Sequence, residues 1–288
     1  MISTQDQISG VSTLLQHFNL EKYSHKTVAV KANFNSADPY PASTHPDTLR
    51  ALFTELKKRD AHIILAERSG MGVTEKVLTT LGIHDLVSEY DGEVLTLDSL
   101  KKEQFSRISG EHWSKGFLLA QVFLDADYVI STCCLKTHRF GGHFTLSLKN
   151  SVGAVARHNP QDRHDYMMEL HQSPHQRKMI AEINAAFPCD LVILDAVKGF
   201  STSGPDKGHL IEPHVLLASA DRIATDAVGV AILRYYGTTP EVEKGTIFEQ
   251  EQIKRAVELG LGAKSFSDIE IVPLNVEAEK LTEKLEIS

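Results

Sequence analysis

Residues 128–156 read YVISTCCLKTHRFGGHFTLSLKNSVGAVA, and this stretch decides how the rest of the chain is interpreted. Its first residues are apolar and β-branched, which is typical of a buried strand. We expect this strand to end in a loop that carries Lys136, Thr137 and His138. In α/β proteins, ligands bind beyond the carboxyl ends of the strands, so the sequence predicts a ligand site here.

A second polar group follows the pair Gly141 and Gly142 and consists of Lys149 and Asn150 among small apolar residues. Burying an ammonium without a partner is costly, so Lys149 should meet an anion or a carboxylate. The lysine either binds a ligand, including as a covalently bonded amine, or extends to water at a helix end. The predicted catalytic residues of this stretch are His138 and Lys149, and the predicted ligand-binding residues are Lys136, Thr137, Gly141, Gly142 and Asn150.

A third group of candidate residues follows the strand expected at 189–197, which ends near Asp195. The next loop, residues 198–208, is rich in glycine and carries Gly204 and Lys207 as expected ligand-binding residues, but it lacks the phosphate-loop pattern. We expect Asp195 to be catalytic and to close the site with this loop. Asp226, further on, fits either a helix cap or an active carboxylate.

Histidine is the unusual component of the composition. The chain has fourteen histidines, and eight of them fall between His138 and His214. Histidine ordinarily titrates near neutral pH, so His138 fits an acid, a base or a metal ligand. We expect any metal to be held by His138, His143 and His164, although their spacing matches no known zinc motif. The expected cofactor is a transition metal or a nickel-type nucleotide.

Composition narrows the class of protein. The chain has 288 residues, of which 42% are hydrophobic, and a net charge of −8. This charge argues against nucleic acid as a partner. No apolar stretch is long enough to span a membrane, and the N-terminus does not look like a signal peptide, so we expect a cytoplasmic protein with no membrane partner. The three cysteines include no CxxC pair, and Cys133 and Cys134 fit a core better than a metal cage.

Strand-like and helix-like segments alternate along the chain. This alternation predicts an α/β fold with a mainly parallel sheet covered by helices, in two lobes with a cleft at the strand C-terminal ends. We expect one such unit over residues 20–275, an N-terminal helix in residues 1–19 and a peripheral C-terminal helix in residues 276–288. The expected strands are residues 27–34, 62–66, 93–97, 127–132, 189–197, 214–219 and 269–272.

Three ordered blocks resemble the family known as domain of unknown function 362. They are DYVISTCCLKTHRFGGHFTLSLKNSVGA (127–154), LVILDAVKGFSTSGPDKG (191–208) and LLASADRIATDAVGVAIL (216–233). The resemblance implies no settled activity. Many members of that family carry a ferredoxin-like module with clustered cysteines, which this sequence lacks, so an iron–sulfur cluster is not expected here.

The order of His138, Lys149 and His164 is also similar to that in the catalytic domain of nickel-dependent lactate racemases. That resemblance implies that the lysine holds a nickel-pincer nucleotide and that a later histidine lies near the metal. The family's Gly-Thr-His motif is absent, because this chain has Glu-Arg-Ser-Gly at 67–70.

Two hypotheses of function follow. The first is an enzyme that binds an anionic small molecule or a nucleotide-like cofactor and performs racemase- or isomerase-like chemistry. The alternative is a non-catalytic accessory protein that handles metal or redox cofactors. A second copy of the chain or a redox protein is the expected protein partner.

Overall fold

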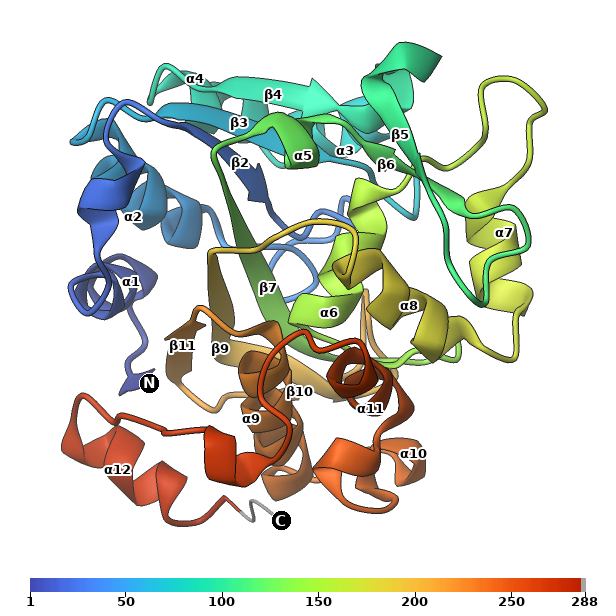
Figure 1. The fold of residues 1–288 in the computed structure, drawn as a ribbon. Coiled ribbons are helices and arrows are strands. Elements are labelled where there is room, and N and C mark those ends of the chain that lie inside the picture. Colours follow the sequence, from blue (N-terminus) through green and yellow to red (C-terminus); the bar gives the residue numbers. More distant parts are fainter. Residues whose placement is uncertain (286–288) are drawn as a thin grey trace.

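A parallel array of strands forms the centre of the molecule (Figure 1). The computed structural model describes residues 1–285. The central strands are β2 (Thr27–Lys31), β3 (His62–Glu67), β4 (Glu93–Thr96), β7 (Tyr128–His138) and β9 (Leu191–Thr202). They lie in the order β9-β7-β2-β3-β4, and every neighbouring pair is parallel. Their carboxyl ends therefore meet at one edge of the sheet.

Antiparallel strands extend this array, so the sheet is mixed but mostly parallel. On one side β11 pairs with β9, and β1 pairs with β11. Two short strands, β8 and β10, pair with the ends of β7 and β9, while β5 and β6 form a separate small sheet. The bounds of these strands are β1 (Ile2–Ser3), β5 (Phe105–Ile108), β6 (Phe117–Ala120), β8 (His143–Thr145), β10 (His209–Ile211) and β11 (Val215–Ser219).

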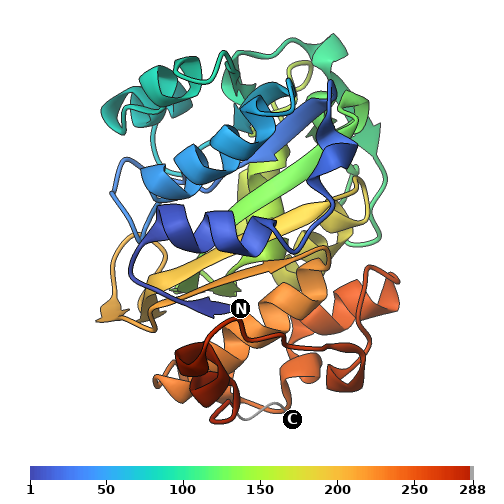
Figure 2. The ribbon, with the colours of Figure 1, turned by 90° about the vertical axis from the view of Figure 1, so that its left-hand side faces the viewer.

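Helices cover both faces of the sheet, because side chains alternate along each buried strand. Val28 and Val30 face one apolar core together with α1 and α2, which Figure 2 shows in front of the strands. Ala29 faces the other core, together with α8 and α9. The described helices are α1 (Gln7–Leu15), α2 (Pro46–Lys57), α3 (Thr74–Thr80), α4 (Ile83–Ser88), α5 (Val122–Asp125), α6 (Ser147–Asn150), α7 (Tyr166–Gln172), α8 (Gln176–Asn184), α9 (Arg222–Tyr235), α10 (Pro240–Glu243), α11 (Glu251–Glu258) and α12 (Val276–Thr282).

The expected α/β class is confirmed, but two local predictions are wrong. Lys136, Thr137 and His138 lie in β7 and not in a loop. Hydrogen-bonded partners keep them extended, because β8 pairs with all three and β9 pairs with Lys136. The strand expected at 269–272 does not form. This segment instead meets the N-terminus, where the Met1 amine donates to the Val272 carbonyl at 2.8 Å.

Each terminal segment contains a helix in the part that the structure describes. α1 lies within residues 1–19, and α12 begins the C-terminal segment, whose residues 286–288 lie outside the described part. The division into a unit over residues 20–275 stays a prediction. No helix in residues 1–285 is both long and apolar enough to cross a lipid bilayer.

Candidate functional site

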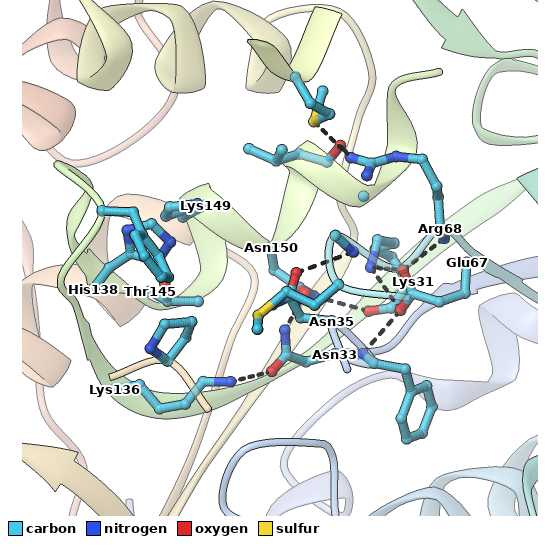
Figure 3. A pocket seen from close by; sticks show the side chains of 18 of the residues that line it. Lys31, Asn33, Asn35, Glu67, Arg68, Lys136, His138, Thr145, Lys149 and Asn150 are labelled. Carbon is cyan, nitrogen blue, oxygen red and sulfur yellow. Dashed lines mark hydrogen bonds and ion pairs between the residues drawn. The ribbon is translucent and has the colours of Figure 1, made fainter. Parts of the chain in front are cut away.

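A cavity of about 490 Å³ opens where β2, β3 and β7 end (Figure 3). This is the edge of the sheet at which α/β proteins bind ligands, and the volume is typical of small-molecule sites. Its wall combines basic, amide and apolar side chains. The lining residues are Lys31, Asn33, Phe34, Asn35, Glu67, Arg68, Gly70, Met71, Lys136, His138, Phe140, Thr145, Lys149, Asn150, Val152, Gly153, Met167, His171 and Pro205.

The end of β7 supplies two of the predicted residues through strand alternation. Lys136 and His138 are two positions apart, so they lie on one face of the strand, and both line the cavity. Thr137 lies between them and does not line the cavity. Its hydroxyl donates to the Phe200 carbonyl at 3.2 Å and accepts from the Gly204 amide at 3.1 Å. Thr137 and Gly204 therefore join β7 to the 203–208 loop outside the cavity.

The short helix α6 supplies Lys149 and Asn150, and a buried carboxylate holds its first turn. Asp226 on α9 accepts from the Ser147 amide at 2.7 Å and from the Leu148 amide at 3.1 Å. These are amides that a helix start leaves without a partner inside the helix. Asp226 is thus a cap, one of the two roles expected for it. Asn150 ties the same turn to the sheet, because its amide donates to the Lys31 carbonyl at 3.1 Å.

One ion pair is enclosed in the cavity wall. The Lys31 ammonium lies 2.7 Å from Glu67 Oε1, and both side chains are almost fully buried. Burial lowers the pKa of Lys31 and raises that of Glu67, while each partner opposes the shift of the other. Glu67 also accepts from the amides of Phe34 and Arg68. The pair is therefore neutral overall and satisfied within the protein.

Two further cations are partly satisfied by the protein. The Lys136 ammonium donates to Asn33 Oδ1 at 2.6 Å and to the Ala42 carbonyl at 2.5 Å. The Arg68 guanidinium donates to the Val155 carbonyl at 2.8 Å and the Val152 carbonyl at 2.7 Å. These neutral acceptors hold the side chains in place, but they do not cancel the positive charge.

Lys149 has no such partner. Only 8% of the residue is exposed, and among the described residues nothing forms a hydrogen bond or ion pair with its ammonium. Burial, followed by the nearby charges of Arg68 and Lys136, lowers the pKa of Lys149 to about 7. The cavity has four basic side chains, Lys31, Arg68, Lys136 and Lys149, but one carboxylate, Glu67, which Lys31 already neutralises. An anionic guest would relieve this imbalance.

Two imidazoles face each other in the wall. The rings of His138 and His171 are stacked, with centroids 6.0 Å apart and planes 10° from parallel. Burial and nearby cations, first among them Lys149, lower the pKa of both, to about 4 for His171. The Nδ1 atom of His138 accepts from the Gly142 amide at 3.3 Å, so the neutral ring carries its hydrogen on Nε2.

Gly142 lies next to two of the three predicted catalytic residues, His138 and Lys149. A Cβ atom at this position would lie 2.6 Å from Lys149 Cε and 2.8 Å from His138 Nδ1. The missing side chain therefore allows the two functional groups to approach each other. Gly141 has a positive φ of 78° and makes the turn between β7 and β8, but it does not line the cavity.

The rest of the wall is partly apolar. Phe34, Val152 and Met167 lie in it, and the exposed side chains of Met71 and Phe140 also line it. Thr145 adds one hydroxyl, buried without a hydrogen-bond partner among the described residues. A ligand with a charged group and a short organic part would meet both kinds of surface.

Asp195 does not line this cavity, although we expected it to join His138 and Lys149. It accepts from the Tyr40 hydroxyl at 2.6 Å and the Thr48 hydroxyl at 2.8 Å, and is almost fully buried. These residues lie before and within α2 and cover the carboxylate. Lys207 is exposed and likewise outside the lining.

The three histidines expected to bind a metal do not converge. His138 lines the cavity, whereas His143 and His164 do not, and His164 instead bonds Glu169 at 2.6 Å. These residues therefore do not fit a shared metal centre. Within residues 1–285, one group has the geometry of a metal site, Glu111 with His112 and Glu182. The Arg255 guanidinium already bridges its two carboxylates.

Sequence reasoning missed four ionisable residues of the cavity wall: Lys31, Glu67, Arg68 and His171. The first three had a usable signal, because they stand at or just after the end of an apolar strand, as Lys136 does. His171 belongs to the histidine-rich segment, and nothing in its spacing distinguished it from its neighbours.

The fold and the cavity define an α/β protein with a basic cavity at the ends of parallel strands. A model of the family described as domain of unknown function (DUF362) matches residues 28–231, and the chain belongs to this family. No curated protein matches the chain.

A solved structure shares the fold. The chain is similar to the lactate racemase apoprotein from Thermoanaerobacterium thermosaccharolyticum, with a TM-score of 0.51 and 17% sequence identity. The match covers 81% of this chain and 57% of that one, so the chain spans little more than half of that racemase's length. At this identity the likeness concerns the fold alone.

Proposed function

We propose that this protein is an enzyme that binds a small organic anion in the cavity at the ends of β2, β3 and β7 and performs racemase- or isomerase-like chemistry on it. The observation that carries the proposal is Lys149, a residue only 8% exposed whose ammonium lines the cavity without a partner among the described residues and lies near the basic side chains of Arg68 and Lys136. A bound anion favours the charged form of such a lysine, so the ammonium and the anion stabilise each other.

The division of the cavity supports a small organic anion over a bare inorganic one. Lys149, His138 and Thr145 lie together on one side, and the neutral Lys31–Glu67 pair lies on the other (Figure 3). Apolar side chains complete the wall. The likeness of fold to a racemase favours the isomerase class, and the neutral imidazole of His138 offers an Nε2–H donor to a developing negative charge. The proposal involves no metal.

Anion binding by matched lysine variants tests this function. Titration calorimetry with lactate at pH 6.5 would compare the wild-type protein with Lys149→Gln and with Lys198→Gln. Lys198 is a half-exposed lysine paired with Glu212, away from the cavity. We expect at least a tenfold loss of affinity in Lys149→Gln and wild-type affinity in Lys198→Gln. Equal affinity in all three proteins would refute the proposed binding site.

A further inference from the structure

The cavity contains an amine with the surroundings of a nucleophile. The Lys149 side chain is buried and has no hydrogen-bond or ion-pair partner within residues 1–285. Its neighbours Lys136 and Arg68 are cations that disfavour a third positive charge. A desolvated lysine beside other cations is a recognised means of keeping an amine neutral and reactive. Burial and these charges lower the pKa of Lys149 to about 7, so much of the amine is neutral at physiological pH.

We propose that Lys149 forms an imine with the carbonyl carbon of a small oxo acid bound in the cavity. This inference rests on the proposed function and names both its substrate class and its covalent step. The carboxylate of the oxo acid would lie among the basic side chains, and its carbonyl would lie against the Lys149 amine. The cavity volume of about 490 Å³ accommodates such a molecule with its side chain.

The step balances without any further reactant. The lone pair of the neutral Lys149 amine attacks the carbonyl carbon, and the carbonyl π electrons move to oxygen. A proton passes from nitrogen to that oxygen, which gives a carbinolamine. The nitrogen lone pair then expels the hydroxyl group, which takes a proton from solvent and leaves as water, and the product is the protonated imine. A protonated imine withdraws electrons from the adjacent carbon, so a C–H bond there becomes acidic, which is what an isomerase requires.

Two polar groups are placed to assist this step. His138 and Lys149 lie next to the same position of Gly142, where other residues have a Cβ atom. The Nδ1 atom of His138 accepts a hydrogen bond from the Gly142 amide, which leaves Nε2–H as a donor. Thr145 lies opposite Lys136 in the β7–β8 ladder, and its buried hydroxyl has no partner among the described residues. These groups supply hydrogen bonds to the oxygen of the carbinolamine. Lys136 instead is held by Asn33 and Ala42, so it is the poorer nucleophile.

Reductive trapping tests the imine directly. The full-length protein would be incubated with glyoxylate or pyruvate and sodium borohydride, then digested and analysed by peptide mass spectrometry. We expect a reduced adduct on Lys149 in the wild-type protein and in Lys198→Arg. Lys149→Arg keeps the positive charge but cannot form an imine, so it should show none at this position. The yield at Lys149 should rise with pH around 7, whereas exposed lysines should react only at higher pH.

The outcomes separate this inference from the proposed function. Absence of an adduct on Lys149 with both oxo acids, or equal labelling of Lys149 and the exposed lysines, would overturn the imine. Acetate and lactate cannot form an imine, so their binding, measured by calorimetry, reports on the proposed function alone. Binding of lactate without trapping of either oxo acid would leave the anion site intact and reject only the covalent step. Thermal melting of Lys149→Arg would verify that the variant is folded.

Discussion

The carboxylate of Asp226 accepts a hydrogen bond from the backbone amide of Ser147 at 2.7 Å, two residues before Lys149. This contact joins α9, on one face of the sheet, to the short helix that presents the amine. α6 has only four residues and no side-chain cap of its own. A helix this short is not stable alone, so the placement of Lys149 depends on a carboxylate from a distant part of the chain.

Removing this carboxylate should weaken both the fold and the site. Asp226→Ala leaves the amides of Ser147 and Leu148 buried without an acceptor, and we expect a loss of about 1–3 kcal/mol in the free energy of unfolding. Urea denaturation measures this loss, and lactate titration should show weaker binding. Asp6→Ala is the control, since it removes an exposed helix cap from α1 and should leave binding unchanged. Normal binding in folded Asp226→Ala would contradict the positioning role.

Anion binding should depend on pH through Lys149. Its pKa in the folded protein is lowered to about 7, so the ammonium becomes less populated as pH rises through this value. The affinity for lactate should therefore fall as pH rises through about 7. A bound anion stabilises the ammonium in return and should raise the pKa of Lys149. Calorimetry between pH 6 and 9 would measure the first effect. A flat profile in the wild-type protein would show that Lys149 does not carry the binding.

The same lowered pKa affects stability without ligand. The pKa of lysine is near 10.5 in the unfolded chain and about 7 here, so the unfolded state binds more protons between these values. The contribution of Lys149 to stability is therefore present above pH 10.5 and declines as pH falls toward 7. Lys149→Met removes this contribution to the pH dependence. Parallel stability profiles for wild type and Lys149→Met across this range would argue against the lowered pKa.

Removing one charge of the Lys31–Glu67 ion pair should destabilise the protein more than removing both charges. Lys31→Met leaves Glu67 buried without its cation, and we expect a loss of about 3–5 kcal/mol. Lys31→Met combined with Glu67→Gln removes both charges and should recover much of this loss. Guanidinium denaturation of the two single variants and the double variant would give the coupling energy. Additive losses would show that the two side chains act independently, contrary to their 2.7 Å contact.

Gly142→Ala should disturb the site more than the fold. The added methyl group would meet Lys149 Cε and His138 Nδ1 at distances well below normal contact. The long lysine side chain can move away, so we expect a stability loss of only about 1–3 kcal/mol. The lactate affinity should fall at least tenfold, because Lys149 and His138 are forced apart. Unchanged affinity in this variant would mean that their close approach is not needed for binding.

Replacement of Asp195 should leave lactate binding unchanged. The carboxylate bonds Tyr40 and Thr48 and lies outside the cavity lining, so its structural contacts account for its burial. Asp195→Asn should lower the free energy of unfolding by about 1–3 kcal/mol while the lactate affinity stays at the wild-type value. Loss of binding in a folded Asp195→Asn variant would restore the catalytic role expected from the sequence.

Much of the fold was predictable because its signals are local. Pro46 opens α2 at its first turn, and Gly82 follows α3 with a φ of 68°, both as helix chemistry requires. The false strand at 269–272 has the same apolar pattern as a real one. In the structure the backbone of this segment bonds Met1, just before the two-residue strand β1, and no ladder of described residues extends along it; whether a longer partner strand is present depends on the whole sheet.

The sequence could predict only those residues of the cavity that lie close together in one segment of the chain. His138 and Lys149 lie close in sequence, whereas Lys31 and Glu67 reach the cavity because β2 and β3 happen to be adjacent in the sheet. Asp195 looked equivalent to Lys136, since both follow apolar strand residues. The two differ because Tyr40 and Thr48 cover Asp195, a contact across about 150 residues of sequence that strand patterns do not encode.

The excess of cations around Lys149 has a practical consequence for anyone handling this protein. The basic side chains should attract small anions with little selectivity, so chloride, phosphate and acetate from buffers will compete with any natural ligand of the cavity. Weak guests will go undetected in ordinary saline. Screens for them therefore belong in bulky zwitterionic buffers nearly free of halide, with a salt titration run alongside each hit.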